Sequence, residues 1–289
     1  MPISAVRVIF FMSIFVNLTF THCWGRSFII EMGLIKEILY KALGPRVYFR
    51  LISTTFLALY RIGFLKLFAK FQGHYLAGRL IDEGDYIIDI GANLGYFTTI
   101  FARKAGMEGK VMAVEPVGLY LNILRFNTRK YNNIEIIPFA LGEKDGDALM
   151  GIPDRLDSRH GLTRIIKPDE QKNIRTLYEA EVRKPDSLFK NIKKLNYIKC
   201  DIEGHEGNVI PGFEDVIRKF RPMIQIELAE KNHVKIESFL YGFGYSAFHA
   251  KGKYLSPAGS SKRETGDLFF LTEKQIEKHG STLLKQNVN

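Results

Sequence analysis

Cysteine is scarce in this chain, and its scarcity excludes two kinds of protein. Only two of the 289 residues are cysteine, Cys23 and Cys200, so the sequence shows neither a disulfide framework nor a Cys/His metal motif. Cys200 stands inside an apolar run, which predicts a buried thiol. The remaining composition, 46% hydrophobic and 25% charged, is typical of one globular domain with or without an extension.

The chain also lacks a hydrophobic run long enough to cross a membrane. Val8 to Phe20 is strongly apolar, but it is shorter than the roughly 20 residues that a bilayer requires. Arg7 precedes it as in a signal peptide, yet no small-residue cleavage site lies near Cys23. We expect a peripheral or weakly anchoring helix here; a helix packed on the domain and an upstream start-codon artefact are the alternatives.

Acidic residues are outnumbered, with 31 Asp and Glu against 41 Lys and Arg and a net charge of +10. The excess is concentrated in residues 1–84, which favours contact with an anionic membrane, glycan or protein. No nucleic-acid-binding module is visible, so nucleic acid is not expected. Between Phe28 and Leu80, apolar residues at helical spacing predict two or three helices, which either cover the domain or lie on a membrane surface.

A glycine-rich turn organises the rest of the chain. Tyr86 to Ile90 is typical of a strand buried in a parallel sheet. Gly91, Asn93 and Gly95 follow at alternate positions, and both residue types tolerate a positive φ. Tyr96 to Lys104 then predicts a helix. Strand, tight turn and helix together form the opening of a nucleotide-binding unit.

The ligand of this turn is inferred from its charge. A dinucleotide site would have glycine where Asn93 stands. Asp89 places a carboxylate at the turn, which repels a pyrophosphate and attracts an ammonium or sulfonium group. S-adenosylmethionine carries both cations and no phosphate. Glu115, about 20 residues beyond the turn and at the end of a predicted strand Lys110–Val114, is placed to accept hydrogen bonds from ribose hydroxyls.

Alternating strands and helices predict a parallel sheet. Leu119–Tyr131 is a predicted helix and Ile134–Pro138 the next strand, so Asp89, Glu115 and Phe139 fall at strand ends where ligands bind. Asp145–Glu181 departs from this alternation and is interpreted as a substrate loop with short antiparallel strands at Ala148–Gly151 and Ala180–Arg183. Its cationic side chains either meet an anionic substrate or form a solvated face: Arg155, Arg159, His160 and Arg164.

A second polar stretch follows a predicted strand, Asn196–Asp201. Asp201, Glu203 and Glu206 lie within six residues, which is costly beside a buried strand unless they have partners or a role. Lys199 shares a strand face with Asp201 and is a natural partner for one of these acids. Glu206 precedes a predicted helix, Gly207–Phe220, whose start favours negative charge. We interpret His205 as a surface or packing residue.

These residues resemble the FkbM-type S-adenosylmethionine-dependent methyltransferases over roughly Asp82 to Leu271. The glycine turn Asp89–Gly95, Glu115-Pro116 and Ala140–Gly142 match the family pattern. The most specific match is Lys-x-Asp-x-Glu-Gly-x-Glu, present as Lys199, Asp201, Glu203, Gly204 and Glu206. One departure is Pro185-Asp186-Ser187-Leu188, where the family usually has Leu-Asp-x-Leu.

The resemblance implies an α/β fold, a Rossmann-like, seven-stranded class I methyltransferase sheet that is mostly parallel with an antiparallel last strand. We expect an N-terminal helical extension over residues 1–80, which lies outside the resemblance, a methyltransferase domain over 81–275 and a flexible tail over 276–289. Pro222–Glu227, Tyr245–His249 and Leu268–Leu271 are the expected later strands, with a helix over Glu230–Tyr241.

The implied activity is methyl transfer from S-adenosyl-L-methionine, most often to a hydroxyl of a glycan, lipid-linked saccharide or secondary metabolite, in the cytoplasm. The expected catalytic residues are Asp201, Glu203 and Glu206. A metal on Asp201, Glu203 and Glu227 is conceivable, but a metal-free site is favoured because no His or Asn stands at ligand spacing. The expected cofactor-binding residues are Asp89, Gly91, Asn93, Gly95, Glu115, Ala140 and Asp201.

Two other functional classes stay open. One is a nicotinamide-dependent oxidoreductase, against which Asp89 and Asn93 argue. The other is a non-catalytic, methyltransferase-like protein that docks at membranes through residues 1–80, against which the cluster of acids from Asp201 to Glu206 argues. Titration with each cofactor and a methyl-transfer assay distinguish these classes.

Overall fold

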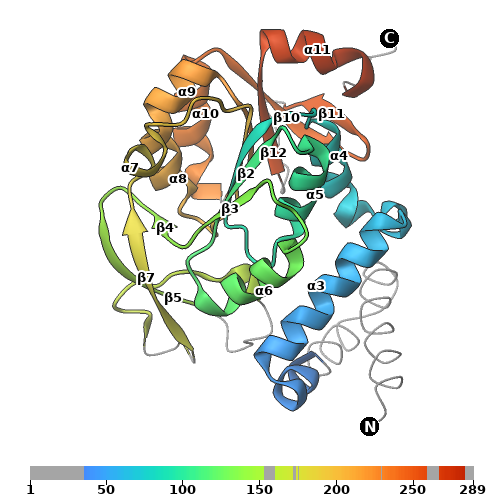
Figure 1. The fold of residues 1–289 in the computed structure, drawn as a ribbon. Helices are drawn as coiled ribbons and strands as arrows, with labels where there is room; N and C mark the ends of the chain where they lie inside the picture. The colour runs from blue at the N-terminus through green and yellow to red at the C-terminus, as the bar shows by residue number, and fades with distance from the viewer. Residues whose placement is uncertain are drawn as a thin grey trace.

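The computed structural model describes residues 36–152, 160–171, 174, 176–228, 230–258 and 267–283. Its centre is a sheet in the order β11-β10-β12-β9-β8-β1-β2-β3 (Figure 1). The predicted segment Val8–Phe20 lies outside the described residues. The strands are β1 (Tyr86–Ile90), β2 (Lys110–Val114), β3 (Ile134–Ile137), β8 (Tyr197–Cys200), β9 (Met223–Glu227), β10 (Tyr245–Lys251), β11 (Tyr254–Pro257) and β12 (Asp267–Thr272).

The strand directions confirm the predicted fold class. β1 pairs in parallel with β2 and β8, and β3 and β9 continue the parallel sheet on either side. β12 runs antiparallel between β9 and β10. β11 adds an eighth strand, since the chain turns at Gly252, whose φ is 65°, and pairs back onto β10.

Helices cover both faces of the sheet (Figure 1). α4 (Gln72–Arg79) and α5 (Tyr96–Ala105) lie on one face, with Ile87 and Tyr197 pointing into the same apolar cluster. Their strand neighbours Ile88 and Ile198 point to the opposite cluster, because successive strand residues alternate between faces. That second face is covered by α7 (Pro185–Phe189), α8 (Glu206–Val209), α9 (Glu214–Phe220) and α10 (His233–Gly242).

The predicted single helix Gly207–Phe220 is wrong. The structure divides this segment into α8, a 3-10 turn at Ile210–Phe213 and α9. Pro211 lacks a backbone N–H and cannot continue an α-helical ladder. Similarly, the predicted helix Glu230–Tyr241 begins as a 3-10 turn, Glu230–Asn232, before α10.

The insert after β3 forms a second sheet in the order β4-β7-β5-β6. β5 (Gly146–Gly151) and β7 (Leu177–Arg183) pair antiparallel, as predicted. β4 (Ala140–Leu141) and β6 (Arg164–Ile165) complete the sheet. It brings the insert to the end of the main sheet where the turns after β1 and β2 lie (Figure 1).

The N-terminal helices pack on the domain. α3 (Pro45–Arg61) lies along α5 and α6 (Gly118–Thr128), where Phe49 meets Tyr120 edge to face with ring centroids 5.7 Å apart. Apolar residues on both sides of the predicted boundary at residue 80 share one core. Two 3-10 turns, Phe64–Leu67 and Ala69–Phe71, connect α3 to α4. Among the described residues, no helix combines the length and apolarity needed to cross a bilayer.

The C-terminal segment is helical where it is described. α11 (Glu273–Leu283) packs beside β12 and β11, so the predicted tail 276–289 begins inside a helix. Lys278 of this helix pairs with Asp82.

The burial of Cys200 is confirmed, since its side chain is completely covered within β8.

Candidate active site

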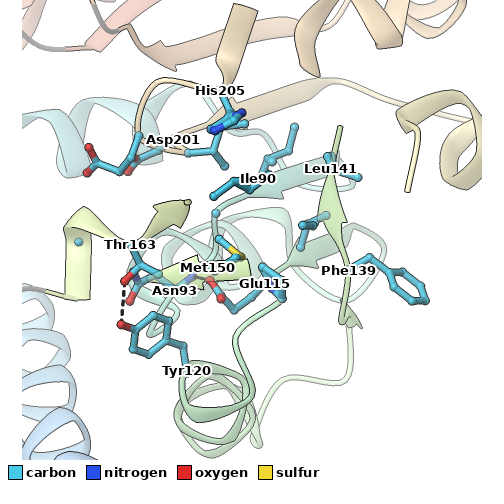
Figure 2. Close-up of a pocket in the computed structure, with 18 residues that line it drawn as sticks. Ile90, Asn93, Glu115, Tyr120, Phe139, Leu141, Met150, Thr163, Asp201 and His205 are labelled. Atoms are coloured by element: carbon cyan, nitrogen blue, oxygen red, sulfur yellow. Dashed lines mark hydrogen bonds between the residues drawn. The ribbon is translucent and has the colours of Figure 1, made fainter. Parts of the chain in front are cut away.

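Two adjoining cavities lie at the carboxyl ends of β1, β2 and β8. The Glu115 cavity is lined mainly by the ends of β1 and β2, by β4 and by the insert (Figure 2). The Lys199 cavity, of about 460 Å³, is lined by the ends of β1 and β8 together with α4, α5 and β10. The cavities meet at shared lining residues, Gly91, Asn93, Gly161 and Asp201.

The glycine turn fits closely between its neighbours. Gly91 has a φ of 76°, and a Cβ atom built on it would lie 1.9 Å from the backbone oxygen of Asp201. Asn93 also has a positive φ, 50°. Gly95 has a φ of 85°, and a Cβ atom there would lie 2.7 Å from Leu124 of α6. Gly91 and Asn93 therefore face the cavities, whereas Gly95 serves the contact between helices.

Asp89 and Lys199 form a buried pair between β1 and β8, whose register places them side by side. Asp89 is completely buried. Its Oδ2 accepts a hydrogen bond of 2.6 Å from Thr98, while Oδ1 has no hydrogen-bond partner among the described residues. The Lys199 ammonium lies 4.0 Å from that Oδ1. One oxygen of Asp89 is thus left to accept from a donor in the Lys199 cavity.

Lys199 also donates to Asp201, at 3.1 Å, so its partner among the neighbouring acids is Asp201. Burial lowers the pKa of Lys199, but the carboxylates of Asp201 and Asp89 outweigh burial and leave that pKa above its usual range. The side chain therefore carries its positive charge inside the protein. It fixes the ends of β1 and β8 relative to each other.

Glu115 fastens the glycine turn to the end of β2. Its Oε2 accepts from the backbone N–H of Asn93 and its Oε1 from that of Val117, both at 2.8 Å. Burial raises the pKa of this carboxyl to about 7, although both hydrogen bonds act in the opposite direction. Each oxygen retains acceptor capacity, and the carboxylate borders the Glu115 cavity (Figure 2).

Asp201 and Glu203 reach the cavities from the loop after β8. Asp201 borders both cavities and Glu203 the Glu115 cavity. Glu203 has a φ of 50°, which is an unusual conformation for a residue with a side chain. Burial, with the nearby charges of Asp201 and Glu206, raises the pKa of Glu203 to about 7.

Glu206, a predicted catalytic residue, borders neither cavity. Its side chain is completely buried. Oε1 accepts from the backbone N–H of Gly204 and Oε2 from the Asn232 amide, both at 2.8 Å. Asn232 donates also to the Gly204 carbonyl, at 3.0 Å. Glu206 therefore holds the loop that carries Asp201 and Glu203, beneath the cavities.

Replacement of Glu206 by alanine is expected to lower the free energy of unfolding by about 2–3 kcal/mol, because the Gly204 N–H and the Asn232 amide lose a charged acceptor. Urea unfolding measures this loss. Glu214→Ala is the control, because Glu214 is an exposed residue paired with Arg218 and its removal costs less than about 1 kcal/mol. Equal losses in the two variants would contradict the structural role.

Several residues of the site escape sequence analysis. His74 of α4 stacks on Phe97 with ring centroids 4.3 Å apart, and burial with the nearby Lys199 charge lowers the pKa of His74 to about 3. Asp267 of β12 accepts from Gln225 at 2.6 Å. His249 borders the Lys199 cavity as well. These residues join the site only through tertiary packing, and the sequence carries no local signal for them.

Glu227 lies at the end of β9 and borders the Lys199 cavity. The negative charge of Asp201 and then burial raise the pKa of Glu227 to about 8. The sequence offered Glu227 only as a conceivable metal ligand. Among the described residues, no group of three or more His, Cys, Asp or Glu side chains is arranged to hold a metal ion.

The insert contributes one wall of the Glu115 cavity. Thr163 and Tyr120 share a hydrogen bond of 2.8 Å across it (Figure 2), and His205, which we interpreted as a surface or packing residue, borders the same cavity. Arg164, a predicted contact for an anionic substrate, pairs with Glu170. The predicted contacts Arg155, Arg159 and the side chain of His160 lie outside the described residues.

The sheet order and the carboxylates at its strand ends define a protein of the class I methyltransferase fold. The sequence profile of the methyltransferase FkbM domain matches residues 89–247, more than half of the chain. The chain belongs to this family, as the resemblance of its motifs implied.

Individual relatives are distant. The chain is 24% identical over 150 residues to "Methyltransferase 1" of Beauveria bassiana, a match that covers 46% of this chain and 60% of that protein. Methyltransferase FkbM from Methylobacillus flagellatus is a similar solved structure, with 17% identity, coverage of 66% of this chain and 44% of that chain, and a TM-score of 0.45. Aeropyrum pernix fibrillarin, solved with natively bound S-adenosyl-L-methionine, has 13% identity, coverage of 65% and 66%, and a TM-score of 0.39.

Proposed function

We propose that this protein is an S-adenosylmethionine-dependent methyltransferase that methylates a hydroxyl oxygen of a glycan, lipid-linked saccharide or secondary metabolite. The observation that carries the proposal is the buried Oδ1 of Asp89, which borders the Lys199 cavity without a hydrogen-bond partner among the described residues. A buried carboxylate oxygen without a donor is costly. An ammonium group of a ligand supplies that donor and a compensating charge.

The residues present fit this cofactor. Asp89 and Asp201 would hold its cationic methionine portion, and the remaining lone pairs of Glu115 would accept from its ribose hydroxyls. Apolar side chains of the Glu115 cavity, among them Ile90, Leu141 and Met150, would enclose the adenine. When bound, the cofactor supplies an activated methyl group. The chain's own contribution is then to orient the acceptor hydroxyl, which can be worth roughly 7–11 kcal/mol, and to receive its proton.

Glu227 is our candidate for the group that takes the proton. It borders the Lys199 cavity, whereas Glu203 borders the Glu115 cavity. A general base works best when its pKa lies near the working pH, and the pKa of about 8 for Glu227 meets this condition. Asp201 raises the pKa of Glu227 and is therefore proposed to adjust the acidity of the base. Glu203 is proposed to orient the substrate from the neighbouring loop.

The rate of methyl transfer is expected to rise with pH up to about 8, because only the deprotonated Glu227 carboxylate, with its pKa of about 8, accepts the proton. Below that pH the rate falls about tenfold per unit. Glu227→Gln should remove this dependence and lower the rate by about 10²–10⁴-fold. The exposed Glu135→Gln, on β3, is the control. An unchanged pH profile in Glu227→Gln would exclude this residue as the base.

The experiment that tests the function combines binding and turnover. Calorimetric titrations with S-adenosylhomocysteine and with NADH are performed on the full chain, followed by labelled-methyl transfer to glycan and lipid extracts. Binding of S-adenosylhomocysteine with labelled product supports the proposal. Binding of NADH alone would replace the proposed methyltransferase function by that of an oxidoreductase. Binding of S-adenosylhomocysteine without methyl transfer to any extract would favour the non-catalytic alternative.

Membrane contact through residues 1–80 stays a prediction. The comparisons with known proteins give it no support. Two large apolar side chains at the end of the α3 segment, Ile62 and Leu67, are each 75% exposed, beside the basic Arg61 and Lys66. Vesicle binding, described below for another surface, tests this contact as well.

A further inference from the structure

A third cavity, of about 580 Å³, lies between helix α4 and the hairpin formed by β10 and β11. We call it the Arg79 cavity. Four of its lining side chains are cationic, and two tyrosines contribute aromatic surface. None of the described residues that line it is acidic. The six that matter here are Lys66, Tyr75, Arg79, Lys251, Lys253 and Tyr254.

The cationic side chains of the Arg79 cavity are partly fixed in place. The Arg79 guanidinium donates to the backbone carbonyl of Lys253 at 2.7 Å. Lys66 lies over the Tyr75 ring at 5.4 Å, and Lys253 over the Tyr254 ring at 5.2 Å. Such contacts stabilise a cation above an aromatic face. The remaining N–H groups of a guanidinium suit phosphate oxygens in particular.

Four cations lining one concave surface, with no acid among its described lining residues, create a positive potential that favours an anion. A phosphate group carries enough charge and enough acceptor oxygens to contact several of them together. The tyrosine rings give the same cavity apolar surface, which suits an organic phosphate. The chemistry of the lining therefore identifies the ligand class as a phosphate-bearing organic molecule.

The Arg79 cavity and the Lys199 cavity share two structural elements. On α4, Gly73 and His74 border the Lys199 cavity, whereas Tyr75 and Arg79 border the Arg79 cavity. On β10, Ala250 borders the Lys199 cavity and the next residue, Lys251, borders the Arg79 cavity. α4 lies next to β10 in the fold (Figure 1). A molecule whose hydroxyl occupies the Lys199 cavity would therefore have to pass the contact between α4 and β10 to reach the cations.

We propose that the Arg79 cavity binds a phosphate group of the methyl acceptor, so that the acceptor is a phosphorylated hydroxyl compound. This inference rests on the proposed methyltransferase function and adds the substrate class to it. The phosphate positions the acceptor from a distance, and its hydroxyl lies beside Glu227. Neither the family match nor the relatives described above assign this cavity a ligand.

The test compares two double variants with the same change in net charge. Lys66→Glu/Lys253→Glu reverses two charges of the Arg79 cavity. Lys190→Glu/Lys219→Glu reverses two exposed charges at the ends of α7 and α9, on the opposite face of the sheet. Inorganic phosphate and glucose 1-phosphate are titrated into each full-length protein and followed by ³¹P NMR. A third variant, Lys66→Met/Lys253→Met, removes both charges but keeps unbranched side chains of similar length. It shows whether weaker binding comes from the loss of charge and not from misfolding of the charge-reversed protein.

We expect the cavity variant to weaken phosphate binding by at least tenfold, the methionine variant to weaken it by a smaller factor, and the control to remain within twofold of the unmodified protein. Added salt should weaken binding in the unmodified protein as well. Equal phosphate affinity in the cavity and control variants, or no binding to the unmodified protein, would overturn the proposal.

Two further measurements separate the sources of the phosphate and the two levels of inference. The protein and its variants are sedimented with phosphatidylcholine vesicles, with and without phosphatidylglycerol. If vesicle binding requires both the anionic lipid and the cavity lysines, the phosphate belongs to a membrane lipid. Otherwise the phosphate belongs to a soluble acceptor. S-adenosylhomocysteine affinity should be unchanged in every variant. If the unmodified protein fails to bind S-adenosylhomocysteine, the proposed function fails, while phosphate binding still reports on the cavity.

Discussion

Replacing Gly91 by alanine is expected to destabilise the protein by about 3 kcal/mol or more. Two effects add at this position. The φ of 76° is unfavourable for any residue with a Cβ atom. In addition, that Cβ atom would lie 1.9 Å from the Asp201 backbone oxygen, and a backbone atom cannot move aside as a flexible side chain would. The turn after β1 and the loop after β8 would have to separate.

The matched control is Gly118→Ala, at the first residue of α6. A Cβ atom at Gly118 meets nothing within 4 Å, and alanine favours the helix, so a gain of up to about 1 kcal/mol is expected. Urea unfolding of both variants measures the difference. A Gly91→Ala protein as stable as the Gly118→Ala protein would show that the turn and the Asp201 loop do not touch as described.

Asp89→Asn is expected to weaken S-adenosylhomocysteine binding at least about 100-fold on the proposed function, which corresponds to about 2.7 kcal/mol. The substitution keeps the shape of the side chain and its reach to Thr98. It removes the negative charge from a fully buried position, where charge interactions are strongest. It also removes one of the two carboxylates that pair with the buried Lys199 ammonium and leaves only Asp201. The free energy of unfolding should therefore fall together with the cofactor affinity.

Two companion variants separate affinity from stability at Asp89. Thr98→Val removes the 2.6 Å hydrogen bond to Asp89 but keeps the carboxylate, so it should cost about 1–2 kcal/mol of stability with little loss of affinity. Glu203→Ala should retain cofactor affinity and lose turnover. Calorimetry and urea unfolding are measured on all three proteins. Full cofactor affinity in Asp89→Asn would contradict the placement of the cationic ligand.

The central βα units could be predicted because their information is local. The strand Lys110–Val114 was predicted with the bounds that β2 has, since a short apolar run between turn residues has few alternatives. The placement of Asp89, Glu115 and Phe139 at one edge of the sheet followed from the rule that ligands bind beyond the carboxyl ends of parallel strands. Strand alternation alone placed Lys199 on the same face as Asp201, so that it could pair with one of the acids.

The remaining parts of the site depend on contacts between distant segments. The role of Glu206 depends on Asn232, which lies 26 residues further along the chain, beyond β9. His74 enters the site because α4 packs against α5 and β10, and Asp267 because β12 pairs with β9. A periodic pattern reports which side of an element is apolar, but it carries no information on which distant element covers that side.

The position of β12 has a consequence for synthesis of the chain on the ribosome. β12 lies between β9 and β10, although it follows both of them in the sequence. Until Asp267–Thr272 leaves the exit tunnel, β9 and β10 present unpaired backbone edges toward each other, and such edges invite pairing with other nascent chains. The sheet can thus close only after Asp267–Thr272 has emerged, later than both of the strands that it joins.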